Sequence, residues 1–150
     1  MKKEKINEIK LKFRAVSTNE SFARIVTTGF LMPYSPTVEE LADIKTAVSE
    51  AVTNAIVHGY RAFIGEITME AEIVDGKVHI NVFDNGIGIE NLQEALEPFY
   101  TTRADDERSG MGFTIMKSFM DDVKVESEKG VGTTIYMTKK ICPTSKNECK

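Results

Sequence analysis

SEAVTNAIVHGY, residues 49–60, combines an apolar helical pattern with three regularly spaced polar residues. Its Ala, Val and Ile residues follow the spacing of a buried helix, but Glu50, Asn54 and His58 interrupt them at intervals of four. Four residues make about one helical turn, so we expect these three side chains to lie on one side of the helix. A carboxylate, an amide and an imidazole on one side of an apolar helix need an explanation, either in a functional site or in ordinary exposed positions.

This stretch is the second half of a longer predicted helix. Thr37 and Glu40 have the spacing of a capping box, which predicts the start of the helix. Gly59 is a suitable C-terminal cap. The apolar stripe that we expect to be buried consists of Leu41, Ile44, Val48, Ala51, Val52 and Ala55.

The segment before this helix predicts a strand and another helix. Residues 6–16 alternate between apolar and mostly charged side chains, which is typical of a half-buried strand. Ser17 and Glu20 predict a second capping box, and the helix after it should end near Pro33, because the residue before a proline avoids helical angles. The apolar residues at helical spacing in this segment are Phe22, Ile25, Val26 and Gly29.

The rest of the chain completes a sheet. Two alternating strands flank Asp75-Gly76, a strong signal for a tight hairpin. A short helix is expected near residues 92–96, a longer one after SGMG, and two final strands near residues 123–126 and 131–138. The order of elements predicts an α+β fold, a two-layer α/β sandwich with a mixed, mostly antiparallel sheet covered on one face by helices. We expect one domain over residues 1–140 and a flexible tail over residues 141–150.

Composition excludes several classes of protein. The 150 residues are 41% hydrophobic and 28% charged, as in ordinary globular domains. A net charge of −4 argues against direct binding to nucleic acid or an anionic membrane, and no apolar run approaches the roughly 18 residues of a membrane span. The N-terminus lacks the apolar stretch of a secretory signal, and Cys142 and Cys149 are expected to be reduced thiols. We therefore expect a cytoplasmic protein.

The motif DNGIGI, residues 84–89, follows a predicted strand. Gly86 and Gly88 allow backbone angles closed to other residues and let a ligand approach the main chain. Asp84 lies where the strand enters the core, and a buried carboxylate needs a hydrogen-bond donor. The exocyclic amine of adenine is one such donor. A tight turn in which Asp84 caps local amides is the alternative.

The motif SGMGFTIMKSF, residues 109–119, places a pair of glycines at the start of a helix. The first amides of a helix have no internal partner and carry partial positive charge, so Gly110 and Gly112 suit a phosphate site. The spacing matches neither a P-loop nor a dinucleotide fingerprint. Taken alone, the motif predicts only the start of a helix.

The segment EPFYTTRADDERSG, residues 97–110, connects the two glycine motifs and is long enough to act as a lid. Thr101, Thr102, Arg103 and Arg108 could donate hydrogen bonds to phosphate oxygens. A solvated surface loop is the alternative.

These motifs suggest roles for the residues of the helix. Asn54 offers an oxygen to a hard cation such as Mg²⁺, which keeps water and phosphate oxygens as its other ligands. Glu50, one turn away, is well placed to accept a proton from an attacking hydroxyl. The alternatives are an ordinary exposed carboxylate for Glu50 and, for His58, an imidazole that interacts with the last carbonyls of the helix.

The order of the motifs resembles the GHKL superfamily of ATPases and kinases. EAVTNAIVHGY resembles its N box, DNGIGI its G1 box and SGMGFTIMKSF its G2 box. The resemblance implies the Bergerat ATP-binding fold, with ATP or ADP and Mg²⁺ as cofactors. It implies that Asn54 binds Mg²⁺, that Asp84 reads the adenine amine and that Thr133, in GVGTT, supports Asp84. It also implies nucleotide contacts at Gly110, Met111 and Gly112.

Within this superfamily the chain is most similar to the sporulation anti-sigma factor kinases, through NESFAR, EPFYTTR, ERSGMGFTIMKSFMD and GVGTT. The resemblance implies inhibition of an RNA polymerase sigma factor and ATP-dependent phosphorylation of a serine on an anti-anti-sigma factor. Arg24, in NESFAR, matches a position at the partner surface. The resemblance also implies a homodimer, for which the N-terminal strand is a candidate contact.

Three alternatives stay open from the sequence. The first is a non-catalytic module that sequesters a sigma factor and uses nucleotide only to order its lid. The second is an anti-sigma kinase that serves a stress-response sigma factor. The third is a structural domain that binds no nucleotide.

Overall fold

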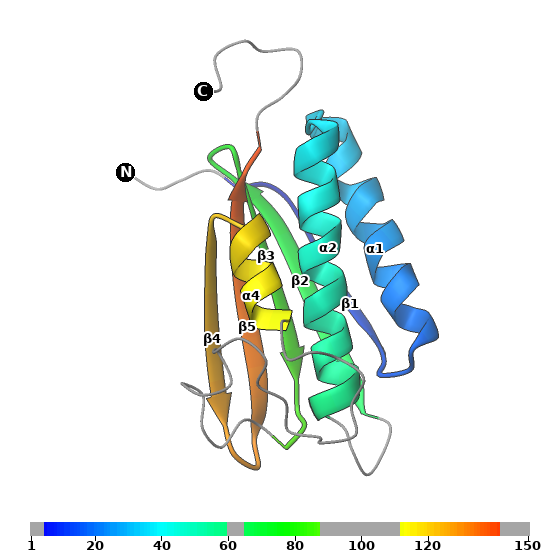
Figure 1. The fold of residues 1–150 in the computed structure, drawn as a ribbon. Helices are drawn as coiled ribbons and strands as arrows, with labels where there is room; N and C mark the ends of the chain where they lie inside the picture. Colours follow the sequence, from blue (N-terminus) through cyan, green and yellow to red (C-terminus); the bar gives the residue numbers. More distant parts are fainter. Residues whose placement is uncertain (1–4, 60–64, 88–111, 142–150) are drawn as a thin grey trace.

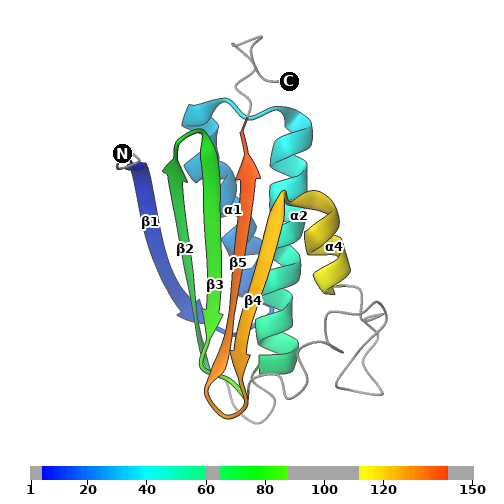
Figure 2. The same ribbon diagram turned by 90° about the vertical axis from the view of Figure 1, so that its left-hand side faces the viewer.

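The computed structural model describes residues 5–59, 65–87 and 112–141. These residues form two layers, an antiparallel sheet and a layer of helices on one of its faces (Figure 1). Figure 2 shows the sheet from its other face, with the helices behind it. The predicted α+β sandwich is therefore confirmed.

The described strands form one sheet with the order β1-β2-β3-β5-β4, and every neighbouring pair is antiparallel. Their bounds are β1 (Lys5–Arg14), β2 (Glu66–Val74), β3 (Lys77–Asp84), β4 (Asp122–Glu128) and β5 (Gly132–Lys140). The N-terminal strand β1 is thus an edge strand. The hairpin predicted at Asp75-Gly76 joins β2 to β3, and both turn residues have positive φ, 53° and 75°, as a two-residue hairpin requires.

The described helical segments are α1 (Thr18–Leu31), η1 (Met32–Tyr34), α2 (Val38–Asn54), η2 (Ala55–Gly59) and α4 (Gly112–Phe119). The capping box predicted at the start of α2 is confirmed. The Glu40 amide donates to Thr37 Oγ1 over 3.0 Å, and the Thr37 amide donates to Glu40 Oε1 over 2.8 Å. This cap fixes the first turn of the helix that carries the polar residues of the opening stretch.

The capping box predicted for α1 is wrong. Ser17 has helical backbone angles, and its side chain makes no capping hydrogen bond. The Glu20 carboxylate instead accepts a hydrogen bond from Ser49 Oγ of α2 and pairs with Arg24. A contact between two helices has therefore replaced the local one.

The buried face of α1 also differs from the one that the spacing of Phe22, Ile25, Val26 and Gly29 indicates. Phe22, Ile25 and Gly29 are exposed, and Val26 is half-buried. The residues that α1 buries are Ala23, Thr27, Phe30 and Leu31. The helix is confirmed, but it is rotated so that part of its apolar surface faces solvent.

The end of α2 is not a regular α-helix. From Ala55 to Gly59 the backbone forms a π-helical turn, and the Ala55 amide donates to the carbonyls of both Ala51 and Val52. A π turn holds more residues than an α turn. One-turn spacing therefore relates Glu50 to Asn54, as predicted, but does not extend to His58, whose side chain lies outside the described residues.

The core lies between the sheet and α2. The predicted stripe of α2 is confirmed, because Ile44, Val48, Ala51, Val52 and Ala55 are buried and Leu41 is half-buried against them. Their partners are inward-facing residues of β2, β3 and β5, namely Ile67, Met69, Ile80, Val82, Ile135 and Met137. No helix in the described part of the chain has the length and apolar character needed to cross a bilayer.

Candidate nucleotide site

Among the residues that the structure describes, the predicted site residues other than Arg24 lie on segments that meet toward one end of the molecule. At the lower end in Figure 1, α2 and β3 finish and β5 begins, and η2 contacts both strands. Glu50 and Asn54 lie on α2, Asp84 ends β3, and Thr133 lies on β5. Gly86 follows β3 by two residues, and Gly112 begins α4, which packs against α2. Predictions for Gly88, Thr101, Arg108, Gly110 and Met111 concern residues outside the described part of the chain, as do those for residues 92–96 and 142–150.

Asp84 is a buried carboxylate at the end of β3. Only 3% of its surface is exposed, and its Oδ1 accepts a hydrogen bond from the Gly86 amide over 2.9 Å. Burial raises the pKa of Asp84 to about 6, although backbone hydrogen bonds from Gly86 and Thr133 act in the opposite direction. The predicted burial is confirmed, and the carboxylate also makes the local turn contact that was its alternative reading.

Thr133 and Ser127 extend this polar group across the sheet. Thr133 lies opposite Asp84 in the register of β3 and β5, and Ser127 of β4 lies opposite Thr133. Thr133 is 5% exposed, and its hydroxyl oxygen lies 2.7 Å from that of Ser127. We did not identify Ser127 from the sequence, because a serine in an alternating strand usually faces solvent.

Gly132 lets the start of β5 pack closely against the backbone of Asp84 at the end of β3. Its φ of 140° is one that L side chains rarely adopt, and a Cβ at this position would lie 2.0 Å from the carbonyl oxygen of Asp84. Nearby, the Gly130 amide donates to the Ile87 carbonyl over 2.7 Å. The hairpin between β4 and β5 therefore holds the turn that follows Asp84, and a larger residue at position 132 would separate them.

Glu50 and Asn54 lie one turn apart near the end of α2, and both are half-buried. No group of three or more His, Cys, Asp or Glu side chains suited to a metal ion occurs among the described residues.

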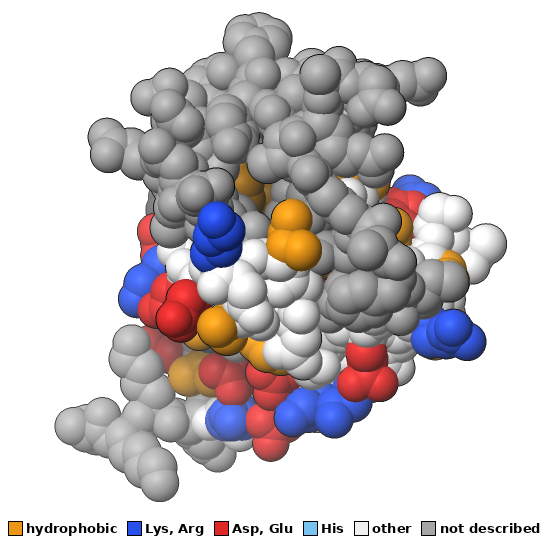
Figure 3. Space-filling view, turned by 90° about the horizontal axis from the view of Figure 1, so that it is seen from below, with side chains coloured by type: hydrophobic (Ala, Val, Ile, Leu, Met, Phe, Trp, Pro, Cys, Tyr) orange, Lys and Arg blue, Asp and Glu red, His pale blue; other side chains and the backbone are white. Residues whose placement is uncertain are grey.

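Figure 3 looks at this end of the molecule from below. Charged side chains of both signs lie around the left, lower and right sides of the described surface, with uncharged atoms and a few hydrophobic side chains between them.

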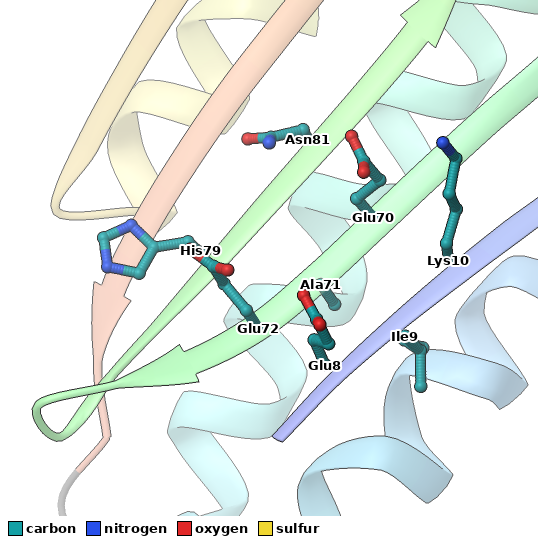
Figure 4. A pocket seen from close by; sticks show the side chains of 8 residues that line it. All are labelled: Glu8, Ile9, Lys10, Glu70, Ala71, Glu72, His79 and Asn81. Carbon is teal, nitrogen blue, oxygen red and sulfur yellow. The ribbon is translucent and has the colours of Figure 1, made fainter. Parts of the chain in front are cut away.

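A hollow on the uncovered face of the sheet does not suit a nucleotide. It has a volume of about 310 Å³, and its charged lining side chains include Glu8, Glu70 and Glu72 beside Lys10 (Figure 4). Three carboxylates would repel a phosphate, and none of the predicted site residues lines this hollow.

Arg24, the predicted partner-binding residue, is a half-buried residue of α1, which is not one of the segments that carry the predicted nucleotide-binding residues. Its Nε lies 2.9 Å from Glu20 Oε1, and part of its side chain is exposed. A hollow of about 480 Å³ is lined by Ser21, Arg24, Ile25, Thr28, Gly29 and Lys45. Phe22 and Ile25, which are 46% and 67% exposed, add apolar surface to the same helix.

Comparison with known proteins identifies the family. The profile of the histidine kinase-like ATPase domain matches residues 14–139. The chain belongs to this family. The anti-sigma F factor of Clostridium acetobutylicum is 59% identical over 135 residues, which are 90% of this chain and 94% of that protein. The anti-sigma F factor of Caldanaerobacter subterraneus subsp. tengcongensis is 55% identical with the same coverage. The resemblance to anti-sigma F factors within the GHKL superfamily is therefore confirmed.

Solved structures show the same fold. The RsbU and RsbW domains of Rv1364c from Mycobacterium tuberculosis match with a TM-score of 0.66 and 20% identity over 90% of this chain and 32% of that one. Full-length ShkA in complex with AMPPNP matches with a TM-score of 0.57 and 20% identity over 83% of this chain and 31% of that one. The Bergerat-type architecture predicted from the sequence is thus confirmed.

Proposed function

We propose that this protein is an anti-sigma factor and a serine kinase. In this proposal it binds and inhibits a sporulation sigma factor of RNA polymerase, and it uses ATP with Mg²⁺ to phosphorylate a serine of an anti-anti-sigma factor. The observation that carries the proposal is the pair Glu50 and Asn54, one turn apart on α2, at the end of the molecule where Asp84 is buried. The high identity to anti-sigma F factors supports the choice of partners.

The described residues fit an adenine nucleotide. Asp84 is a buried acceptor with a raised pKa, and a donor such as the adenine amine would stabilise its ionised form. Asp84, Gly86 and Thr133 would hold the base, Gly112 at the start of α4 would meet the phosphates through backbone amides, and Asn54 would bind the Mg²⁺. The bound nucleotide supplies the phosphoryl group for transfer.

In this proposal Glu50 accepts the proton of the substrate serine hydroxyl. Its place one turn before Asn54 puts the carboxylate beside the residue that would bind the cation. The buried anchors Phe113 and Met116 of α4 keep the first amides of that helix in position against α2. Positioning and charge stabilisation by such fixed groups account for most of the catalysis in phosphoryl transfer.

We assign the protein partners to the outer face of α1, by which we mean Phe22, Arg24, Ile25 and Gly29. Arg24 would pair with an acidic side chain of the partner, and the exposed Ile25 would pack against an apolar one. We also propose a homodimer. The edge strand β1 is the candidate contact, and it lies on the side of the sheet away from β4.

The test is the substitution Glu50→Gln, which keeps the size of the side chain and removes its basicity. Binding of ATP and of the sigma factor should stay within about twofold of the natural protein, while transfer of labelled phosphate to the anti-anti-sigma factor should fall by at least about 100-fold. Glu39→Gln, an exposed residue in the first turn of the same helix, is the matched control and should change neither.

Normal phosphorylation by the Glu50→Gln variant would show that Glu50 does not accept the proton of the substrate serine. If the natural protein captured a sigma factor but transferred no phosphate, the non-catalytic sequestering module would be the correct function. A pull-down with ATP or ADP present would identify which partner each nucleotide favours.

A further inference from the structure

A row of three polar side chains crosses the sheet at the nucleotide end. The antiparallel registers place Asp84 of β3 opposite Thr133 of β5, and Thr133 opposite Ser127 of β4. Asp84 and Thr133 are buried and Ser127 is half-buried. Water is therefore largely excluded from the row, so each of its polar atoms needs a protein or ligand partner.

The contacts of Ser127 set the direction of the hydrogen bonds in this row. Its hydroxyl donates to the Gly132 carbonyl over 3.1 Å and lies 2.7 Å from the hydroxyl of Thr133. A serine hydroxyl has one proton, and a carbonyl oxygen can only accept. Both hydrogen bonds form together when Ser127 donates to Gly132 and Thr133 donates to Ser127.

We propose that Ser127 fixes the direction of the Thr133 hydroxyl, and that this makes the row an acceptor that selects adenine over purines with a 6-keto group. This inference rests on the proposed nucleotide function and deepens it by naming a residue that controls the choice of base. Ser127 is a positioning residue in this scheme, because it acts through Thr133.

The selectivity follows from hydrogen-bond chemistry. When the proton of Thr133 points at Ser127, only the lone pairs of its Oγ1 remain for a ligand. Next to it, the ionised carboxylate of Asp84 is also an acceptor. The 6-amino group of adenine donates to such a row, whereas the 6-keto oxygen of hypoxanthine presents lone pairs to lone pairs. A site built to pair with a donor rejects an analogue that lacks it, because its buried polar groups stay unpaired.

The experiment measures the dissociation constants of ATP and inosine triphosphate, each with Mg²⁺, by calorimetry on the full chain. The natural protein should prefer ATP. In Ser127→Ala the Thr133 hydroxyl can rotate and donate, so the ratio of the two constants should fall by about tenfold, mainly through tighter binding of inosine triphosphate. ATP binding should change by less than about threefold.

Three further variants separate this role from simple damage to the fold. Ser127→Thr keeps the hydroxyl and should keep the ratio of the natural protein. Ser127→Cys, which conserves volume better than alanine, should reproduce the fall if Ser127→Ala is poorly folded. Ser118→Ala removes an exposed hydroxyl that bonds within α4, to the Thr114 carbonyl, and should have no effect.

A double substitution tests the route through Thr133. In a Thr133→Val background, Ser127→Ala should cause no further change in the ratio, because there is no hydroxyl left to rotate. An unchanged ratio in Ser127→Ala, or an equal loss of both nucleotides, would overturn the role of Ser127 and leave the nucleotide site standing. If the natural protein bound neither nucleotide, the proposed function itself would fail.

Discussion

The nucleotide end and the outer face of α1 depart from ordinary packing in opposite ways. At the nucleotide end, Asp84 and Thr133 are polar and buried. On the outer face of α1, Phe22 and Ile25 are apolar and exposed. Burying a carboxylate costs stability, and an exposed apolar patch carries a risk of non-specific association. Both departures occur where the sequence predicts binding, one to a nucleotide and one to protein partners.

The two regions also differ in what holds them. The row at Asp84 depends on strand register, on the backbone of Gly132 and on hydrogen bonds to main-chain amides. The face of α1 consists of side chains on a helix whose other side is packed. Substitutions in the first region should therefore change folding and binding together, whereas substitutions in the second region should reduce binding without a loss of stability.

Gly132→Ala should have the largest effect on stability. The added Cβ would lie 2.0 Å from the Asp84 carbonyl oxygen, so the β4–β5 hairpin would have to move. We expect the free energy of unfolding to fall by at least about 3 kcal/mol, measured by urea denaturation. Gly130→Ala is the matched control, since Gly130 also has positive φ but no atom within 4 Å of its Cβ position. That variant should lose only about 1 kcal/mol, and equal losses in the two variants would contradict the close approach.

Asp84→Asn should weaken ATP binding and increase the stability of the nucleotide-free protein. We expect ATP affinity to fall by about 100-fold in calorimetry, because a charged acceptor becomes an amide that can present a donor to the base. The nucleotide-free protein should become more stable at pH 7.5 by about 1–3 kcal/mol, because a desolvated charge is removed. Nucleotide binding at the natural affinity would show that Asp84 does not read the base.

The pH dependence of stability in the natural protein and in Asp84→Asn tests whether the buried charge of Asp84 causes the difference in stability. The pKa of Asp84 is about 6 in the folded protein, compared with an ordinary value of 3.8. Between these values the folded state holds more protons than the unfolded state, so the contribution of Asp84 to stability falls as the pH rises and is lowest above pH 6. The stability advantage of Asp84→Asn should therefore grow from about pH 4 to pH 7 in denaturation experiments. A constant difference would mean that burial does not perturb this carboxyl group.

Ile25→Ser, on the outer face of α1, should weaken partner binding with almost no change in stability. Ile25 is 67% exposed, so its replacement should change the free energy of unfolding by less than about 0.5 kcal/mol. Affinity for the protein partners should fall by about tenfold, as expected for an apolar residue near the centre of an interface. Val38→Ser, on the even more exposed first residue of α2, should change neither quantity. Equal binding by all three proteins would move the partner surface away from α1.

Local patterns predicted the parts of the fold that local physics determines. Period-two alternation identified the strands, Asp75-Gly76 the hairpin, and Thr37 with Glu40 the start of α2. Each of these signals needs only neighbours in the chain. The burial of Asp84 was predictable as well, because a strand leading into the core leaves its last residue little solvent.

The errors have a common cause, which is packing between distant segments. The Ser17 cap gave way to a bond between Glu20 and Ser49, residues of different helices. The buried face of α1 could not be read from spacing, because apolar residues occur on both sides of that helix. The roles of Ser127 and Gly132 at the site could be recognised only from the strand register, which places both residues beside Asp84. Residues in contact through the fold have no signature in a single sequence.

Gly29→Ala should have the smallest effect and the most specific one. Gly29 lies inside α1, and an added Cβ would have no atom within 4 Å, so the variant should gain about 0.5–1 kcal/mol of stability from better helix propensity. The same methyl group would project into the hollow that Arg24 and Ile25 also line, so it would collide with a partner bound there. We therefore expect a more stable protein with partner affinity reduced by a few-fold and unchanged ATP binding, measured by thermal denaturation and calorimetry. Tighter partner binding would place the contact elsewhere on the helix, and a loss of stability would show that the residue is not in an open helical position.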